Sequence, residues 1–305
     1  MHKVIVSGAN GFIGSSLVKK LIGKGIKVVA LIHSSDSNLN EIRSENLDIV
    51  PFDRAVLEDV KEMPYIGYDA FYHLAWSGVS TFGRKDSSLQ LQNVRMTLDA
   101  LNLAHRLSCK KFIGIGSIME DESLAVTNSS RAYPGESYTY GIAKLAAHGL
   151  SKISAVSLGV DFNWVKVTNT YGVGELSTRL ISDTLRKIIQ GCEPSFTSCT
   201  QNYDFIYIDD LVEALVLVGQ YGRSFAEYRV GSNHPQPLKN FIEIIRTKFA
   251  KDLNFKYGAI PYSGVNLPLE SFDCTRTYQE IEFCPKVSFE EGIAKTLYWM
   301  KTLER

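Results

Sequence analysis

The sequence predicts an α/β fold in which a doubly wound parallel sheet is joined by a smaller C-terminal domain. Three observations lead to this prediction. The chain opens with a short β-branched run, a glycine-rich turn and an amphipathic helical pattern. Strand-like and helix-like segments then alternate through the first half. Beyond Thr168 this alternation breaks, and loops containing glycine and proline become frequent.

The opening unit is a predicted strand, Lys3–Val6, followed by three glycines at three-residue intervals. Gly8 permits a tight turn, Gly11 lets the backbone approach a pyrophosphate, and Gly14 lets the next helix pack closely on the strand. The helix N-terminus then offers free N–H groups to the phosphates. This pattern indicates a Rossmann-type dinucleotide site, and an ordinary glycine-rich turn is the alternative. The expected cofactor contacts from this turn are Gly8, Asn10, Gly11, Phe12, Ile13 and Gly14.

The later elements follow in order along the chain. Strands are predicted at 27–32, 47–52, 70–74, 111–116 and 164–167, and long helices at 89–107 and 140–158. Right-handed crossovers between such units produce a parallel sheet that is covered by helices on both faces. A helix over 209–218 and a strand over 228–231 are expected to return to the main sheet. We therefore predict a cofactor-binding domain of residues 1–167 plus about 209–232, and a substrate-binding domain of residues 168–208 plus 233–305.

The composition argues against several classes of protein. Lys plus Arg equals Asp plus Glu at 33 each, so the charge balance argues against nucleic-acid binding. No apolar run reaches the length of a membrane span, and the first strand begins too early for a signal peptide to precede it. The five cysteines are scattered without Cys-x-x-Cys pairs, so we expect reduced thiols in a cytoplasmic protein and no metal site.

The end of the second predicted strand bears on the choice of dinucleotide. An NAD site usually has an acidic residue here, which bonds the ribose 2′-hydroxyl. This chain has His33, Ser34 and Ser35 instead, and these side chains could accommodate a 2′-phosphate. We therefore expect NADP, with NAD as the alternative if the segment is an ordinary polar loop.

Two candidate catalytic residues, Tyr140 and Lys144, stand one helical turn apart on a predicted helix. A free tyrosine has a pKa near ~10, but a cation four residues on, together with a cationic nicotinamide ring, stabilises the phenolate. Tyr140 could then exchange a proton with a sugar oxygen while the nicotinamide exchanges a hydride. Ser117 ends a predicted strand at the sheet edge where ligands bind, and its hydroxyl could hold the same oxygen. The alternative for Ser117 is a turn residue or a helix cap.

Several motifs occur together in a fixed order. They are Gly8 to Gly14, His73-Leu74-Ala75-Trp76, Ser117, Tyr140-x-x-x-Lys144, Asn169-Thr170-Tyr171-Gly172 and the run from Asp204 to Asp210. Through these motifs the chain resembles, over nearly its whole length, the extended short-chain dehydrogenase/reductase family in its NAD(P)-dependent nucleotide-sugar epimerase/dehydratase branch. Within that branch it is most similar to the reductases of 4-keto-6-deoxysugars.

The resemblance implies roles for individual residues. Ser117, Tyr140 and Lys144 would form the catalytic triad. Asp53 would bond the adenine amino group, and a helix or turn cap is the equal alternative from the sequence alone. His73 would be structural, and Asn93 would brace the strands behind the site. Leu74, Ala75 and Trp76 would line the cofactor, and Trp76 would also face the substrate, although it could equally belong to the core. Loops that leave the sheet and the second domain are expected to supply further substrate contacts. These candidates are Ser77, Ser117, Glu120, Asn169, Arg179 and Tyr203.

Two departures from the family pattern carry information. Dehydratases place Asp and Glu after the catalytic residue, whereas this chain has Ile118 and Met119 there, so a 4,6-dehydratase is not expected. An arginine that often reaches the substrate phosphates is replaced by Tyr203. Either Arg179 supplies that phosphate contact, or the substrate is not a standard sugar nucleotide.

The expected function is NAD(P)-dependent reduction of an NDP-4-keto-6-deoxyhexose at C4, in deoxysugar or polysaccharide biosynthesis. A 4-epimerase would use the same triad, and a non-catalytic NADP-binding sensor or scaffold is an alternative of another class.

Helices 89–107 and 140–158 carry more apolar positions than packing on one face of the sheet requires, and in the family these helices pair across a twofold axis. We therefore expect a homodimer, the alternative being that both stripes belong to the core.

Overall fold

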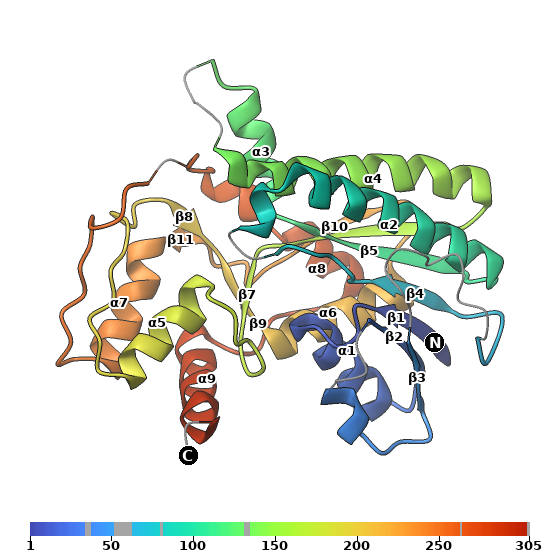
Figure 1. Cartoon of the computed structure of the whole chain (residues 1–305), viewed down its shortest axis with the longest axis horizontal. Helices are drawn as coiled ribbons and strands as arrows, with labels where there is room; N and C mark the ends of the chain where they lie inside the picture. Colours follow the sequence, from blue (N-terminus) through green and yellow to red (C-terminus); the bar gives the residue numbers. More distant parts are fainter. Residues whose placement is uncertain (34–37, 52–62, 80–81, 131–134, 263, 304–305) are drawn as a thin grey trace.

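The computed structural model describes residues 1–33, 38–51, 63–79, 82–130, 135–262 and 264–303. A central sheet carries helices on both faces, and most elements of the C-terminal third gather beyond one end of it (Figure 1). Among the helices described, none is long and apolar enough to cross a membrane.

Seven parallel strands form the central sheet, in the order β10-β6-β5-β4-β1-β2-β3. This Rossmann-type order confirms the predicted fold class and the return of a late strand to the sheet. The strands are β1 (Lys3–Ser7), β2 (Lys27–Ile32), β3 (Leu47–Pro51), β4 (Ala70–His73), β5 (Lys111–Ser117), β6 (Asp161–Val167) and β10 (Glu227–Val230).

Strand β6 begins earlier than the sequence predicts, at Asp161 instead of Trp164. The polar residues Asp161 and Asn163 interrupt its apolar pattern. Asn163 is nevertheless fully buried, and its amide donates hydrogen bonds to the carbonyls of Arg223 (2.6 Å) and Ala226 (3.2 Å). These tertiary partners make a polar residue acceptable inside the sheet.

Two apolar layers pack on the sheet. One face is covered by α2 (Ser87–Arg106) and α4 (Thr139–Leu158), which lie side by side, and the other by α1 (Phe12–Gly23) and α6 (Ile208–Tyr221) (Figure 1). The predicted helices at 89–107, 140–158 and 209–218 are confirmed, and the observed helix over the last range extends to Tyr221.

The glycine turn after β1 is shaped by close backbone contacts. Gly8 has a φ of 70°, and a Cβ atom there would lie 2.6 Å from the backbone nitrogen of Ala75. A Cβ atom at Gly14 would lie 2.1 Å from the carbonyl oxygen of Gly8. Only glycine therefore lets the turn, the end of β4 and the start of α1 meet this closely.

The C-terminal third contributes short elements that the sequence did not reveal. β7 (Asn169–Tyr171) pairs with β9 (Phe205–Tyr207), and β8 (Asn202–Tyr203) pairs with β11 (Gln236–Pro237). The helices here are α5 (Leu180–Ile189), α7 (Leu238–Phe249), α8 (Thr275–Ile281) and α9 (Phe289–Leu303). One apolar cluster runs from the α1 and α6 face of the sheet into these elements, for example from Val4 to Phe241.

Two aspartates of the run 204–210 tie the chain together. Asp204 is fully buried and accepts hydrogen bonds from the hydroxyl of Thr168 (3.1 Å) and the N–H of Ser232 (2.7 Å). Asp210 accepts from the N–H groups of Lys286 (3.0 Å) and Val287 (2.8 Å). These bonds hold the loops beyond the sheet in place.

The five cysteines are free thiols, and three of them are buried.

Candidate active site

The predicted catalytic residues meet at the carboxyl edge of the sheet. Ser117 is the last residue of β5, and Tyr140 is the second residue of α4. The side chain of Ser117 is near enough to Tyr140 to lower the pKa of its phenol. The N–H of Met119 donates to the Ser117 hydroxyl at 3.2 Å, which orients it. The structure therefore brings together two residues that are distant in the sequence.

Lys144 lies one turn along α4 from Tyr140 and is almost fully buried. Its Nζ donates to the carbonyl of Ile115 at 2.7 Å and lies 3.6 Å from the centroid of the Trp76 ring. The same nitrogen is 5.9 Å from the centroid of the Tyr140 ring. Burial lowers the pKa of Lys144 to about 7, and the nearby charge of Glu120 acts in the opposite direction.

Trp76 forms the wall beside these two residues. Its indole N–H donates to Gln90 Oε1 at 2.9 Å, and its ring meets Tyr140 edge to face with centroids 5.9 Å apart. The next residue, Ser77, is held through its backbone, because its N–H donates to Asn93 Oδ1 at 2.8 Å and its carbonyl accepts from Asn93 Nδ2 at 2.9 Å. Asn93 thus braces the loop that follows β4.

His73, which the resemblance makes structural, is buried at the end of β4. Its Nδ1 lies 2.8 Å from the Ser7 hydroxyl and its Nε2 lies 3.2 Å from the Thr97 hydroxyl. Burial lowers the pKa of His73 to about 3, so the ring is neutral at physiological pH. A neutral ring with both nitrogens engaged links β1, β4 and α2.

The start of α1 fits a diphosphate. Gly11 is its N-cap, no side chain caps the helix, and no acidic residue occupies its first turn. Its first N–H groups and its positive dipole end are therefore available to an anion. Gly11 is exposed, and its neighbours Asn10, Phe12 and Ile13 are partly exposed.

The structure describes some of the remaining cofactor candidates and not others. Leu74 and Ala75 follow β4, and the N–H of Leu74 donates to the carbonyl of Ser7 at 3.0 Å. His33 is exposed directly after β2. Ser34, Ser35 and Asp53 lie outside the described residues.

Two of the predicted substrate contacts, Arg179 and Tyr203, face the same region as Tyr140. Arg179 precedes α5, and its guanidinium is near enough to lower the pKa of Tyr140 and of Tyr203. It also forms an ion pair with Glu175 at 3.8 Å. Asn169 lies in β7, and its amide donates to the carbonyl of Asp204 at 3.2 Å.

Glu120 has no accessible surface, so it cannot contact a substrate in this structure. Its carboxylate accepts hydrogen bonds from the N–H of Ser117 at 2.8 Å and from the indole of Trp164 at 3.1 Å. A Cβ atom at Gly116 would lie 2.3 Å from both Glu120 Oε1 and Trp164 Nε1. β5 thus carries a glycine where this buried carboxylate is packed behind Ser117. Burial raises the pKa of Glu120 to about 7.

Two site residues were missed by the sequence analysis. Arg84 lies in the turn η3 (Gly83–Lys85), and its guanidinium carbon is 5.0 Å from the centroid of the Tyr140 ring. Glu122 lies on α3 (Met119–Thr127), where burial raises its pKa to about 7 and the charge of Arg84 acts to lower it. No pattern marks Arg84 in the sequence. Glu122 has the position of an ordinary acid in a first helical turn.

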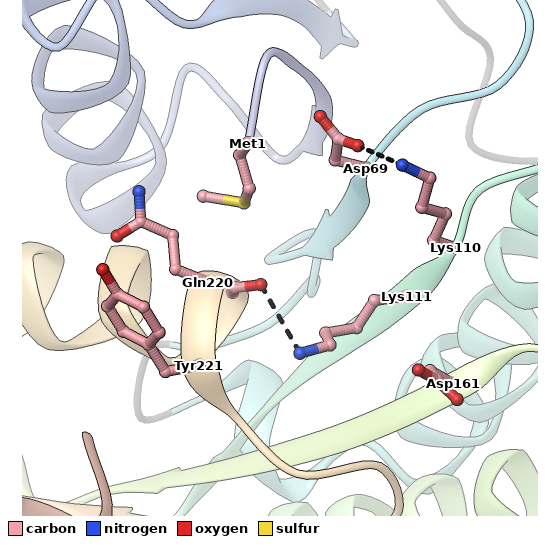
Figure 2. A pocket seen from close by; sticks show the side chains of 8 residues that line it. Met1, Asp69, Lys110, Lys111, Asp161, Gln220 and Tyr221 are labelled. Atoms are coloured by element: carbon pink, nitrogen blue, oxygen red, sulfur yellow. Dashed lines mark hydrogen bonds and ion pairs between the residues drawn. The ribbon is translucent and has the colours of Figure 1, made fainter.

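The opposite edge of the sheet, where the strands begin, holds a hollow of about 380 Å³ (Figure 2). Its charged side chains already have partners. Lys110 pairs with Asp69 at 2.8 Å, and Lys111 Nζ donates to the carbonyl of Gly222 at 2.7 Å. The Tyr140 site lies at the other edge of the sheet, where ligands of such folds bind.

Known proteins share this sequence pattern and fold. Residues 4–231 match the family model described as the NAD dependent epimerase/dehydratase family. The chain is 24% identical to dTDP-glucose 4,6-dehydratase of Streptomyces griseus, over 97% of this chain and 93% of the relative. It is also 24% identical to CDP-abequose synthase of Salmonella muenchen, over 97% of each.

A solved structure of similar fold is UDP-glucose 4-epimerase with UDP-glucose from Thermotoga maritima. The TM-score is 0.81 at 21% identity, over 99% of this chain and 100% of that one. At this identity the likeness shows the fold, whereas the family match spans most of the chain. The chain therefore belongs to the NAD dependent epimerase/dehydratase family and is an enzyme of the extended short-chain dehydrogenase/reductase type.

Proposed function

We propose that this enzyme is a sugar-nucleotide oxidoreductase that reduces the C4 ketone of an NDP-4-keto-6-deoxyhexose. The observation that carries the proposal is that Ser117 lies near enough to Tyr140 to lower the pKa of its phenol, with Lys144 one turn on. Ile118 and Met119 stand directly after Ser117, at the positions where dehydratases carry Asp and Glu. Ile118 is 3% exposed and packs in an apolar cluster with Leu267 and Phe272. Its position therefore has a packing role and supplies no acid or base.

The proposed mechanism assigns one task to each residue. A nicotinamide cofactor, when bound, supplies the hydride for C4. The phenol of Tyr140 donates its proton to the ketone oxygen, and the Ser117 hydroxyl holds that oxygen in place. The N-terminus of α1, together with the turn Gly8–Gly14, holds the cofactor diphosphate. Arg179 and Tyr203 contact the substrate beyond the sugar that reacts.

We propose NADP as the preferred cofactor. His33 is exposed at the end of β2, where it is free to meet a 2′-phosphate. NAD is the alternative, in line with the description of the family. Rates measured with NADPH and NADH on the same 4-keto sugar nucleotide distinguish the two.

The reaction type is tested by the fate of the cofactor. A reductase consumes one NADPH for each 4-keto sugar nucleotide that it converts. A 4-epimerase is the second candidate, because it would use the same three residues and one similar solved structure is a UDP-glucose 4-epimerase. Interconversion of two sugar nucleotides without net use of NADPH would show epimerisation and refute reduction.

The first prediction concerns Tyr140→Phe, which removes the proposed proton donor. We expect the rate to fall roughly 10²–10⁴-fold, because general acid catalysis is lost. Tyr298→Phe, on the exposed face of α9, is the matched control and should keep full activity. Binding of cofactor should survive in both variants, as isothermal titration would show. A wild-type protein without turnover, whose Tyr140→Phe variant keeps both cofactor binding and biological effect, would instead favour the non-catalytic sensor or scaffold.

We also propose that the enzyme is a homodimer built on α2 and α4. Large apolar side chains on these helices are 41–70% exposed, although both helices also pack on the sheet. Such a set of exposed apolar side chains is typical of an interface. The side chains are Leu91, Ile142, Leu150, Ile153 and Val156.

A further inference from the structure

Arg84 is held against the aromatic face of Tyr140 by two hydrogen bonds. Its Nε donates to the carbonyl of Val79 at 2.9 Å, and its Nη1 donates to the sulfur of Met119 at 3.2 Å. These contacts leave the guanidinium carbon 5.0 Å from the Tyr140 ring centroid. Among the residues that the structure describes, Arg84 makes no ion pair with a carboxylate. The carboxyl group of Glu122 acts on Arg84 only through its nearby charge.

Lys144 is less well placed than Arg84 to stabilise a phenolate on Tyr140, which is the role that the sequence pattern predicts for Lys144. Its Nζ is bonded to the Ile115 carbonyl, lies against the Trp76 ring and is 5.9 Å from the Tyr140 ring centroid. Burial also lowers the pKa of Lys144, because desolvation disfavours the charged form of its amine. A guanidinium keeps its charge in proteins. Arg84 thus offers a permanent cation closer to the ring.

We propose that Arg84 is a positioning residue for the reaction, whose guanidinium stabilises the phenolate that Tyr140 becomes after giving up its proton. The proposal rests on the proposed role of Tyr140 as proton donor. In that step the O–H bond of Tyr140 breaks, the proton joins the substrate oxygen as hydride reaches C4, and the phenol is left with a negative charge. The cation over the ring face offsets that charge.

Other charged and titratable groups also face Tyr140. Burial raises the pKa of Tyr140, and the charge of Glu120 on α3 also raises it. The charges of Arg84 and Arg179 lower it, and so does the nearby side chain of Ser117 on β5. Lys144 follows on the same helix. Arg84 is the larger of the two arginine effects. Removing it should therefore make the phenolate harder to form, although Arg179 remains.

The test compares Arg84→Gln, Arg84→Lys and a control, Lys85→Gln, whose own ion pair with Glu136 lies at the surface. The ¹³Cζ signal of Tyr140, assigned by its absence in Tyr140→Phe, is titrated by NMR in the NADP⁺-loaded protein. We expect Arg84→Gln to raise the pH at which Tyr140 loses its proton by about one pH unit. Arg84→Lys should retain most of the effect, and Lys85→Gln should match the wild type.

The rate supplies a second readout. In the oxidation direction Tyr140 must be deprotonated, so the rise of kcat with pH should shift upward in Arg84→Gln and kcat should fall roughly tenfold near neutrality. A raised KM with an unchanged titration of Tyr140 would show that Arg84 only binds substrate and would overturn the proposal. If Tyr140→Phe stays active, the proposed function fails separately, because the NMR titration does not depend on turnover.

Discussion

A single side chain, Lys144, shows a conflict between stability and the proposed chemistry. An ammonium is buried here with one carbonyl and three aromatic rings as near neighbours. Its pKa falls from an ordinary 10.5 to about 7 because the charged form is desolvated. A lysine whose pKa is lowered in the folded state destabilises the fold fully below the folded pKa. That effect disappears above the unfolded pKa.

We therefore predict a pH-dependent effect of Lys144→Met, which keeps the length of the side chain without the charge. The free energy of unfolding of the wild type should rise relative to that of the variant as the pH increases from 7 to 10. Urea unfolding at several pH values measures this difference. Lys20→Met, at a surface ion pair with Glu213, is the control and should show a small difference at every pH. A constant difference for Lys144→Met would contradict the prediction.

The parts of the site that could be predicted are those in local patterns. Tyr140 and Lys144 are one helical turn apart, and Ser117 ends a readable strand, so sequence spacing was sufficient to propose them. Arg84 and the burial of Glu120 could not be predicted in this way. Both depend on contacts between segments that are remote in the sequence, and neither has a periodic neighbour to mark it.

At the level of one element, β5 is shaped by what packs behind it. Gly114 and Gly116 both face Trp164, and a Cβ atom at either position would lie 2.3 Å from an atom of its indole. Glycine is usually unfavourable inside a strand. Here it makes room for the indole and for the carboxylate of Glu120, and that carboxylate accepts hydrogen bonds from the indole and from the N–H of Ser117.

Gly116→Ala should consequently disturb both stability and activity. We expect a loss of about 1–3 kcal/mol, as for overpacking of a core, and slower turnover because Ser117 moves with the strand. Gly23→Ala is the matched control, since a Cβ atom there meets nothing within 4 Å and should stabilise α1 by about 0.5–1 kcal/mol. Equilibrium unfolding in urea provides both values. Equal effects at the two positions would argue against this packing account.

The elements differ in how far the sequence revealed them. β2 was predicted with its observed bounds because a continuous apolar run begins and ends sharply there. β6 was predicted too short because the amide nitrogen of Asn163 donates to the carbonyls of Arg223 and Ala226, which a local pattern does not show. β8 and β11 are two residues each, which is too short for any periodicity to appear.

For the whole molecule, the central prediction is that the enzyme forms a homodimer. Ile153 is 70% exposed on α4, within the proposed interface. Ile153→Glu should convert the dimer to a monomer, because a carboxylate would be buried without a partner. Light scattering coupled to size-exclusion chromatography would measure the mass. Tyr298→Glu, on α9 and 75% exposed, is the control and should leave the mass unchanged. A wild-type mass of one chain at every concentration would refute the dimer.

The fold class could be predicted because alternating strands and helices leave few topologies for a parallel sheet. The predicted return of a late strand to the sheet also proved correct, since β10 pairs with β6. The division into two domains remains a prediction. The arrangement of the short C-terminal elements was not predictable, because their hydrogen bonds, such as those of Asp210 to Lys286 and Val287, join distant positions.

The position of β10 also has a consequence for synthesis of the chain on the ribosome. β10 closes the sheet beside β6, but residues 168–226 must be translated between them. At ~5–20 residues per second this takes roughly 3–12 s. During that interval the outer edge of β6 lacks its neighbouring strand, and a growing chain with an open edge can pair with another chain. The sheet of this enzyme is therefore completed late in translation, after the chain has left it and returned.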